Sequence, residues 1–175
     1  MMAIVINIVA FYAGWFGAAM LAARGLGAWA ALPCLAVVVL RLALSRGSRA
    51  EVALLAAAGA MGLVAEAALL AGGVTRFPGS AVYGVLPPSW LVTLWMAFST
   101  TLNSSLAWLK TRLALAAVLG LAGGPAAYYG GAQLGAMQLG EPLAASLLAI
   151  GVVWAVACPL LAGLAWHLNS ATAKP

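Results

Sequence analysis

The chain has 175 residues, of which 66% are apolar and only 6% are charged, and its net charge is +5. A soluble domain carries roughly a quarter charged residues in its polar shell, so this composition excludes an ordinary soluble fold. The lipid bilayer is the solvent that fits. At about 20 residues per span, the chain has room for at most about seven membrane-spanning helices. The basic residues stand singly between apolar runs, which indicates membrane topology rather than nucleic-acid binding.

Six apolar segments predict an all-α, polytopic transmembrane helical bundle that forms one integral membrane domain over residues 1–175. The segments cover residues 2–23, 27–44, 51–72, 88–107, 113–134 and 143–164. A short apolar stretch at 81–86 precedes the fourth segment, and the tail from residue 167 is polar. Tryptophans near the segment ends, at Trp29, Trp90, Trp108 and Trp166, are typical of the aromatic belts at membrane interfaces.

Basic residues in the short loops predict the orientation of the bundle. The side that holds both termini has Arg41, Arg46, Arg49, Lys110, Arg112 and Lys174, and the other side has Arg24 and Arg76. This bias predicts that both termini lie in the cytoplasm.

Small residues at every fourth position predict where helices approach closely. Three rows stand out: Ala10, Gly14 and Ala18; Ala58 and Gly62, leading to Glu66; and Gly123, Ala127, Gly131 and Gly135. The sequence Gly123-Gly124-Pro125 interrupts the fifth segment, which makes Gly124 and Pro125 a candidate helix break. A continuous fifth helix and a broken or re-entrant one fit the sequence equally well.

Polar and aromatic residues fall at matching depths when position is converted at about 1.5 Å per residue. Trp15, Glu66, Trp95 and Tyr128 form one layer in the outer half; Ser99 lies further in and Gln133 further out. These six residues are the candidate ligand-binding residues. Asn7 and Asn103, nearer the cytoplasm, are expected to form interhelical hydrogen bonds.

Glu66 needs a reason to stand within a span, because an ionisable side chain there costs about 2.5–3.5 kcal/mol on insertion scales. One interpretation is a proton- or cation-responsive group, or a ligand contact, in an intramembrane pocket. The other is a neutral glutamic acid that hydrogen-bonds a neighbouring helix. The sequence leaves both open.

The residue inventory limits the possible chemistry. With no Asp and a single His, the chain cannot build a Ser-His-Asp triad or a zinc or haem site, so we expect no metal and no cofactor. An enzyme here would rest on Glu66, Tyr128 or His167, which favours a non-enzymatic role and assigns no catalytic residue.

A set of motifs spread along the chain resembles a known family. They are Asn7, Trp15-Phe16, Gly62-Leu63-Val64-Ala65-Glu66, Pro88-Ser89-Trp90-Leu91, Leu94-Trp95, the run FSTTLNSSLAWL at 98–109, Leu119-Gly120, Gly124-Pro125-Ala126-Ala127-Tyr128, Gly131 and Leu134-Gly135-Ala136. Together they are similar to the small bacterial inner-membrane family catalogued as domain of unknown function 2878. An Asp usually stands at the position of Glu66 in that family, so the carboxylate is kept. The resemblance implies an uncharacterised protein of the Gram-negative inner membrane and points to a lipid-like ligand.

Three functional hypotheses follow. The leading one is binding or translocation of a small amphipathic molecule in an intramembrane pocket. The others are a membrane enzyme or enzyme subunit in lipid or fatty-acid modification, and a membrane scaffold for partner proteins. The lipid bilayer is the expected partner under all three, a small amphipathic ligand is expected under the first, no nucleic-acid partner is expected, and the sequence does not give the oligomeric state.

Overall fold

The computed structural model describes residues 2–78, 80 and 86–172. These residues form an all-α bundle. Its α-helices are α1 (Met2–Ala23), α2 (Ala31–Leu44), α3 (Arg49–Ala71), α4 (Ser89–Leu102), α5 (Leu113–Gln133) and α6 (Leu143–Thr172). A 3-10 helix, η1 (Ala107–Thr111), links α4 to α5. The strands β1 (Thr75–Arg76) and β2 (Gln138–Leu139) pair antiparallel.

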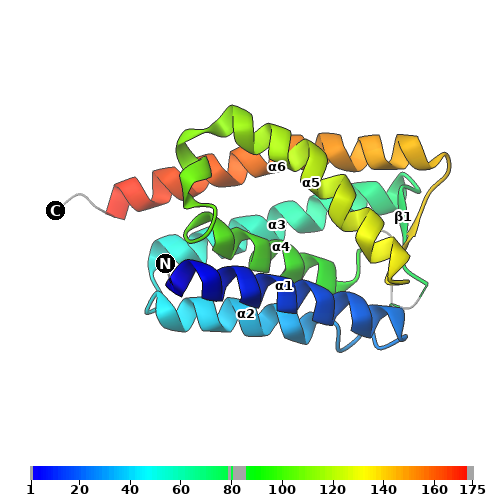
Figure 1. Ribbon diagram of the computed structural model, residues 1–175, viewed down its shortest axis with the longest axis horizontal. Coiled ribbons are helices and arrows are strands. Elements are labelled where there is room, and N and C mark those ends of the chain that lie inside the picture. Colours follow the sequence, from blue (N-terminus) through cyan, green and yellow to red (C-terminus); the bar gives the residue numbers. More distant parts are fainter. Residues whose placement is uncertain (1, 79, 81–85, 173–175) are drawn as a thin grey trace.

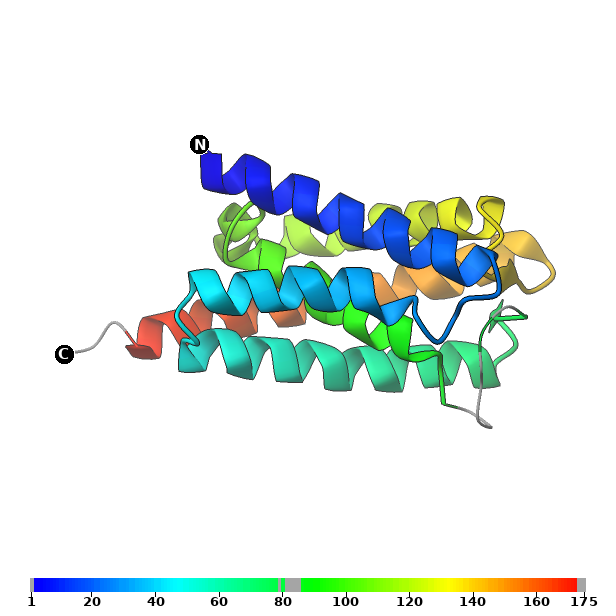
Figure 2. The same cartoon turned by 90° about the horizontal axis from the view of Figure 1, so that it is seen from below.

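The helices run along the long axis of the molecule, and the described chain begins and ends at the same end of the bundle (Figure 1). Helix α4 is central, because it packs against α1, α2 and α3 and also touches α6. Helix α5 packs mainly against α6 and η1. The view from below shows α1, α2 and α3 following one another on one side of the bundle (Figure 2). The helical bundle predicted from the apolar segments is therefore confirmed.

Among the described residues, four helical segments are long and apolar enough to cross a membrane by length and composition. They are Ile4–Ala23, Arg49–Ala71, Leu113–Gln133 and Leu143–Ser170. The predicted spans 27–44 and 88–107 are too long, because α2 and α4 have 14 residues each. At about 1.5 Å per residue these two helices measure about 21 Å, less than the hydrocarbon core of about 30 Å. Turns at both helix boundaries account for the difference: residues 27–30 precede α2, and residues 103–106 separate α4 from η1.

Helix α5 is continuous through Gly124 and Pro125, so these residues are not a helix break, and the continuous helix is the one of the two alternatives that the structure shows. A proline inside a helix leaves the carbonyl four residues earlier without its usual donor and often kinks the helix. Here α6 packs tightly on that turn. A Cβ on Gly151 would lie 3.0 Å from the Leu121 carbonyl oxygen and 3.3 Å from Pro125 Cγ. Such close support from a neighbouring helix makes the proline tolerable.

The last helix and the loops also differ from the prediction. Helix α6 passes through Pro159 and continues to Thr172, so the tail from His167 begins as helix. The strand pair β1–β2 ties the α3–α4 loop to the α5–α6 loop, with Thr75 opposite Leu139. Apart from Leu86, the predicted apolar stretch 81–86 lies outside the described residues.

The small-residue rows are partly confirmed. A Cβ on Gly14 would lie 2.9 Å from Val37 Cγ2 of α2, and one on Gly62 would lie within 2.4 Å of the Trp95 ring of α4. The fifth-segment row fails at Gly123, where a Cβ would meet nothing within 4 Å, but at its other end a Cβ on Gly135 would lie 3.7 Å from Ala23 Cβ, which follows from the close approach of α1 there. The glycines of α5 that α6 packs against belong to the next row, Gly120 and Gly124.

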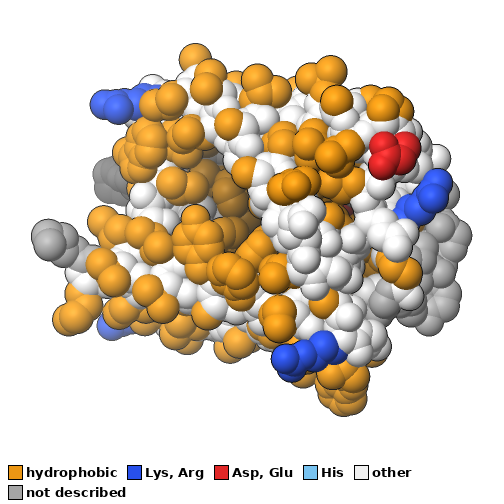
Figure 3. All heavy atoms as spheres, turned by 45° about the vertical axis from the view of Figure 1, so that its right-hand side comes forward, with side chains coloured by type: hydrophobic (Ala, Val, Ile, Leu, Met, Phe, Trp, Pro, Cys, Tyr) orange, Lys and Arg blue, Asp and Glu red, His pale blue; other side chains and the backbone are white. Residues whose placement is uncertain are grey.

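Large apolar side chains cover the outside of the bundle, as a lipid-facing surface requires (Figure 3). Val64, Val118 and Leu148 are among those exposed by more than half. Trp29, Trp108 and Trp166 also lie at the surface. Trp90 does not, because its ring is 2% exposed and its Nε1 donates to Ser80 Oγ at 3.2 Å, so its assignment to the aromatic belt is wrong.

Candidate functional site

Glu66 lies in the C-terminal half of α3 and is fully buried. It shares a helix face with Gly62, one turn earlier, and this face packs against α4. The absence of a side chain at Gly62 lets the indole of Trp95 lie directly on α3. From that position Trp95 Nε1 donates a hydrogen bond to Glu66 Oε1 at 2.8 Å. The glycine therefore allows the indole to lie close enough to α3 for its N–H to reach the carboxyl group.

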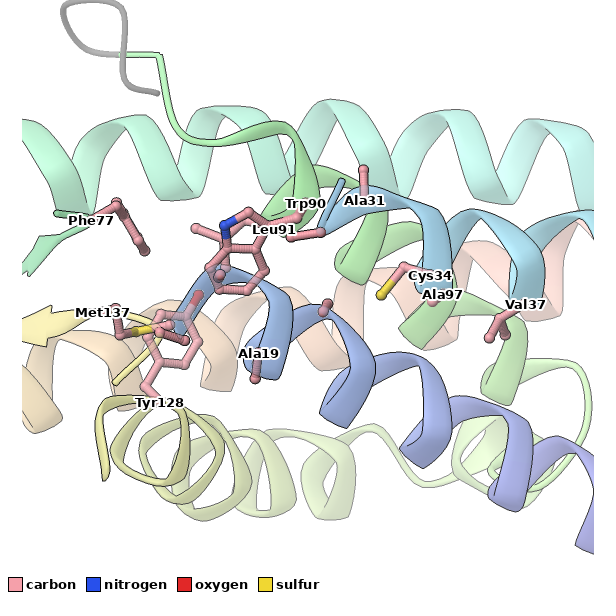
Figure 4. Packing of buried hydrophobic residues seen from close by; sticks show 14 of the residues in the cluster. Ala19, Ala31, Cys34, Val37, Phe77, Trp90, Leu91, Ala97, Tyr128 and Met137 are labelled. Carbon is pink, nitrogen blue, oxygen red and sulfur yellow. The ribbon is translucent and has the colours of Figure 1, made fainter. Parts of the chain in front are cut away.

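A second donor reaches the same carboxyl oxygen from α5. The hydroxyl of Tyr128 donates to Glu66 Oε1, and the tyrosine side chain is 4% exposed. Figure 4 shows Tyr128 projecting from α5 towards Trp90 and Leu91 at the start of α4, with Met137 beside its ring. This hydrogen bond ties α5 to α3 across the interior of the bundle.

Helices α5 and α6 repeat the arrangement seen between α3 and α4. The indole of Trp154 on α6 lies over Gly124, where a Cβ would come within 2.5 Å of its ring. Tyr128 follows Gly124 by one turn, just as Glu66 follows Gly62. The rings of Trp154 and Trp95 stack with centroids 4.2 Å apart and an interplanar angle of 21°. Two glycine-cradled tryptophans thus meet beside the Glu66–Tyr128 pair.

Two polar atoms of this cluster are buried without a hydrogen-bond partner among the described residues. They are Glu66 Oε2 and Trp154 Nε1. The indole N–H lies near the Tyr128 hydroxyl but does not form a hydrogen bond of normal geometry with it. A buried polar atom without a partner is costly, so its presence calls for an explanation.

A cavity of about 460 Å³ borders the cluster. It lies between α1, α4 and α5, with Trp154 and Cys158 of α6 at the back. Its lining consists of Phe11, Tyr12, Trp15, Phe16, Ala19, Trp90, Leu91, Leu94, Trp95, Phe98, Leu119, Gly120, Gly123, Gly124, Ala126, Ala127, Tyr128, Gly131, Met137, Trp154 and Cys158. The space exists because glycines and alanines of α5 face large aromatic rings of α1 and α4. A hollow between hydrophobic side chains is visible on the outside of the molecule (Figure 3).

The structure brings together four of the six candidate ligand-binding residues. Trp15, Trp95 and Tyr128 line the cavity, and Glu66 lies behind the last two, bonded to both. The other two, Ser99 and Gln133, lie elsewhere. Ser99 is buried and donates to the Met96 carbonyl of its own helix at 2.8 Å. Gln133 is exposed at the end of α5 and does not line the cavity.

Asn7 links α1 to the end of α4. Its Nδ2 donates to Thr100 Oγ1 at 3.3 Å, and its Oδ1 accepts from Ser105 Oγ at 2.7 Å. These are the interhelical contacts expected of an asparagine inside a bundle.

Asn103 belongs to a polar cluster at the end of the bundle that holds both ends of the described chain. Its Nδ2 donates to Glu51 Oε2 at 3.0 Å, and its Oδ1 accepts from Asn169 Nδ2 at 2.8 Å. Arg41 forms an ion pair with the same Glu51 oxygen at 2.9 Å. Lys110 lies nearby in η1, where burial lowers its pKa; Glu51 opposes this shift and Arg41 adds to it. The cluster joins the ends of α2, α3, α4 and α6, a structural role.

Sequence reasoning missed Trp154, Phe98 and Glu51. Trp154 and Phe98 pack edge to face with centroids 5.1 Å apart beside the Trp95 stack. The position of Trp154, one turn before Cys158 on α6, carries no polar pattern that would mark it. Glu51 was taken as the start of a span, although an acid three residues after the loop 45–48, with Arg41 four residues before that loop, is a signal for an ion pair.

The chemistry available to the cluster is limited. The described residues contain no group of three His, Cys, Asp or Glu side chains that could hold a metal ion. The site offers a mostly apolar cavity, several aromatic faces and one buried carboxyl group with a spare oxygen.

The match to known families extends over most of this architecture, because the profile of one family covers residues 4–160. The chain belongs to the family described as "Protein of unknown function (DUF2878)". The DUF2878 match includes Glu66 and every residue that lines the cavity, whereas Asn169 of the polar cluster lies beyond it. Membership expected from the sequence motifs is confirmed. No curated protein and no solved structure matches the chain.

Proposed function

We propose that this DUF2878 protein binds a small amphipathic, lipid-like molecule in the cavity between α1, α4 and α5. The observation that carries the proposal is the cavity of about 460 Å³, whose aromatic wall includes both donors to the buried Glu66 carboxyl group. This volume lies within the range of small-molecule sites, which are mostly apolar with a few placed polar groups. The aromatic rings suit a hydrophobic body, and the Tyr128–Glu66 pair suits a polar head.

The setting that we propose is a bacterial inner membrane with both termini in the cytoplasm. The bundle supports it through its apolar outer surface and through the distribution of basic residues. The end of α2, the start of α3 and the junction of η1 with α5 lie at the end of the bundle that holds both ends of the described chain (Figure 1). These segments carry Arg41, Arg46, Arg49, Lys110 and Arg112, whereas Arg24 follows α1 and Arg76 lies in β1, towards the opposite end. A ligand dissolved in the bilayer would reach the cavity from the side, between α1 and α5.

The α1–α5 boundary is a suitable entrance because contact there is sparse. A Cβ on Gly130 would lie 3.4 Å from Trp15 Cη2, and one on Gly135 would lie 3.7 Å from Ala23 Cβ. The Gly135 contact lies at the outer ends of the two helices, and the Gly130 contact is made by the far edge of the Trp15 ring. Further in, Tyr12 on α1 and Leu119 and Gly123 on α5 line the cavity.

Photo-crosslinking can test the proposal directly. The probe is a long-chain alcohol with a diazirine in its chain, added to the purified full-length protein in phosphatidylcholine nanodiscs. We expect adducts on cavity residues such as Trp15 and Phe98, located by mass spectrometry. Adducts confined to outward residues such as Val156, which is 55% exposed, would refute a binding cavity.

A matched pair of variants on α5 sharpens the test. Gly123 lines the cavity and has open space around a Cβ, so Gly123→Leu should fill the cavity without a clash. Ala122 is exposed and outside the lining, so Ala122→Leu adds the same side chain on the lipid side. Gly123→Leu should abolish the cavity adducts, and Ala122→Leu should preserve them.

The two rival hypotheses predict different results in a deletion strain. An enzyme or enzyme subunit acting on lipid predicts altered lipid species that Glu66→Ala or Tyr128→Phe fails to restore. A scaffold predicts a stable co-purifying complex that tolerates Gly123→Leu.

A further inference from the structure

The cavity wall is rich in aromatic faces. Tryptophan, tyrosine and phenylalanine from α1, α4, α5 and α6 all contribute, and Trp15, Trp95, Trp154 and Tyr128 surround its outer part. The face of an aromatic ring carries partial negative charge and attracts cations, with tryptophan the strongest of the natural side chains. Quaternary ammonium groups are recognised in this way by aromatic cages.

The formal charge next to the cavity is negative, like the partial charge on the aromatic faces. The lining contains no Lys, Arg or His among the described residues. Arg41 is paired with Glu51 in the polar cluster near the end of the bundle. Glu66 is the acidic side chain next to the cavity, separated from it by its donors Trp95 and Tyr128.

The carboxyl group of Glu66 has spare capacity. Both donors bind Oε1, and Oε2 is buried without a partner among the described residues. A bound cation would lower the free-energy cost of burying this second oxygen, because a buried charge is tolerated when an opposite charge lies close to it. An anionic head group would have the opposite effect, since it would meet a carboxyl group and π faces with no basic partner.

We infer that the ligand of this cavity is a hydrophobic cation, such as an amine or quaternary ammonium group on an apolar body. The inference rests on the proposed function and specifies its ligand class. The cationic head lies against the faces of Trp15, Trp95 and Tyr128, with Glu66 behind them as the counter-charge. The apolar body extends along the glycine face of α5 towards Phe98 and Leu119.

Competition among head groups on one chain length tests the charge preference. The competitors are dodecyltrimethylammonium, dodecanol and dodecanoate, added against the diazirine alcohol at a pH where dodecanoate is ionised. Zwitterionic phosphatidylcholine nanodiscs avoid a surface charge that would concentrate one competitor. Concentrations are corrected for partition into protein-free nanodiscs. We expect the cation to suppress the cavity adducts at about tenfold lower concentration than dodecanol, with dodecanoate the weakest.

Two variants distinguish the contribution of the Glu66 charge to cation binding from that of the aromatic wall. Glu66→Gln should reduce the advantage of the cation over dodecanol to less than about threefold, because the counter-charge is lost. Trp15→Leu removes one aromatic face on a half-buried residue that lines the cavity, and it should weaken the cation several-fold more than it weakens dodecanol, with adducts on Phe98 as the readout. Trp15→Leu decides the question if Glu66→Gln does not fold.

The possible outcomes separate this inference from the proposed function. Cavity adducts that dodecanol or dodecanoate suppress as well as the cation does would overturn the inference and leave the binding cavity standing. A cation preference that survives in every variant that folds would also overturn it. The absence of cavity adducts from the wild-type protein would refute the proposed function itself.

Discussion

Two glycines on α5, three residues apart, face different surroundings, and the contrast makes a sharp prediction. A Cβ on Gly120 would lie 2.2 Å from the Trp154 carbonyl oxygen of α6 and 3.1 Å from Cys158 Sγ. A Cβ on Gly123 would meet nothing within 4 Å. We therefore expect Gly120→Ala to destabilise the bundle and Gly123→Ala to leave it unchanged or slightly more stable.

The size of the destabilisation by Gly120→Ala depends on whether the neighbouring atoms can move away from the added Cβ. The atom opposite Gly120 belongs to the backbone of α6, so the clash cannot be relieved by a side-chain rotation and the two helices must separate. Overpacking of this kind costs about 1–3 kcal/mol. Replacing glycine by alanine in a helix contributes up to about 1 kcal/mol of stability, and this gain is common to both variants. The free energies of unfolding of the two variants should therefore differ by about 1–3 kcal/mol.

Reversible unfolding of the purified protein in mixed micelles, with increasing SDS and tryptophan fluorescence as the signal, measures this difference. The stacked Trp95 and Trp154 lie next to the substituted helix, so their emission reports on the relevant contact. Equal stabilities for the two variants, or a more stable Gly120→Ala, would refute the close α5–α6 contact.

Two further substitutions address the polar clusters with the same unfolding assay. Tyr128→Phe removes one of the two donors to the buried Glu66 and should cost about 1–3 kcal/mol, whereas Tyr129→Phe, 45% exposed on the same helix, should change stability by less than about 0.5 kcal/mol. Equal effects would contradict the bond across the bundle. Arg41→Ala leaves the Glu51 carboxylate buried without its ion pair and should cost about 3 kcal/mol, the low end for buried pairs because Arg41 is 22% exposed. A double substitution, Arg41→Met with Glu51→Gln, should recover most of the loss, and no recovery would show that the pair is not the cause.

The sequence was sufficient for the all-α class and for the number of helices among the described residues, because each helix is an apolar run bounded by charged or turn-forming residues. It was insufficient for the lengths of α2 and α4. Their flanking residues, such as Gly27 before α2 and Ala107 after α4, are apolar or small enough to continue a helix. Tertiary contacts decide that they form turns and a 3-10 helix instead. Apolarity alone does not mark a helix end in a chain with so few charges.

The depth of residues along their spans predicted the centre of the candidate site. Counting residues placed Glu66, Trp95 and Tyr128 at one level, and the structure joins them by hydrogen bonds. Depth does not fix the direction in which a side chain points. Ser99 was therefore included, although it bonds its own helix, and Gln133 was included, although it points outward.

Rotation about the helix axis also explains why the sequence did not show which face of α5 borders the cavity. Helix α5 contains two overlapping rows of small residues, and either row would permit close packing. Only the tertiary structure shows that Gly120 and Gly124 receive Trp154, so that Gly123 and Ala127 are left facing α1. Helix α5 has small residues on two faces, but a neighbouring helix packs closely against only one of these faces. A gap is therefore left beside the other face. In this protein that gap adjoins the buried carboxyl group, so the same glycine-rich segment that brings Tyr128 to Glu66 also creates the space for a ligand.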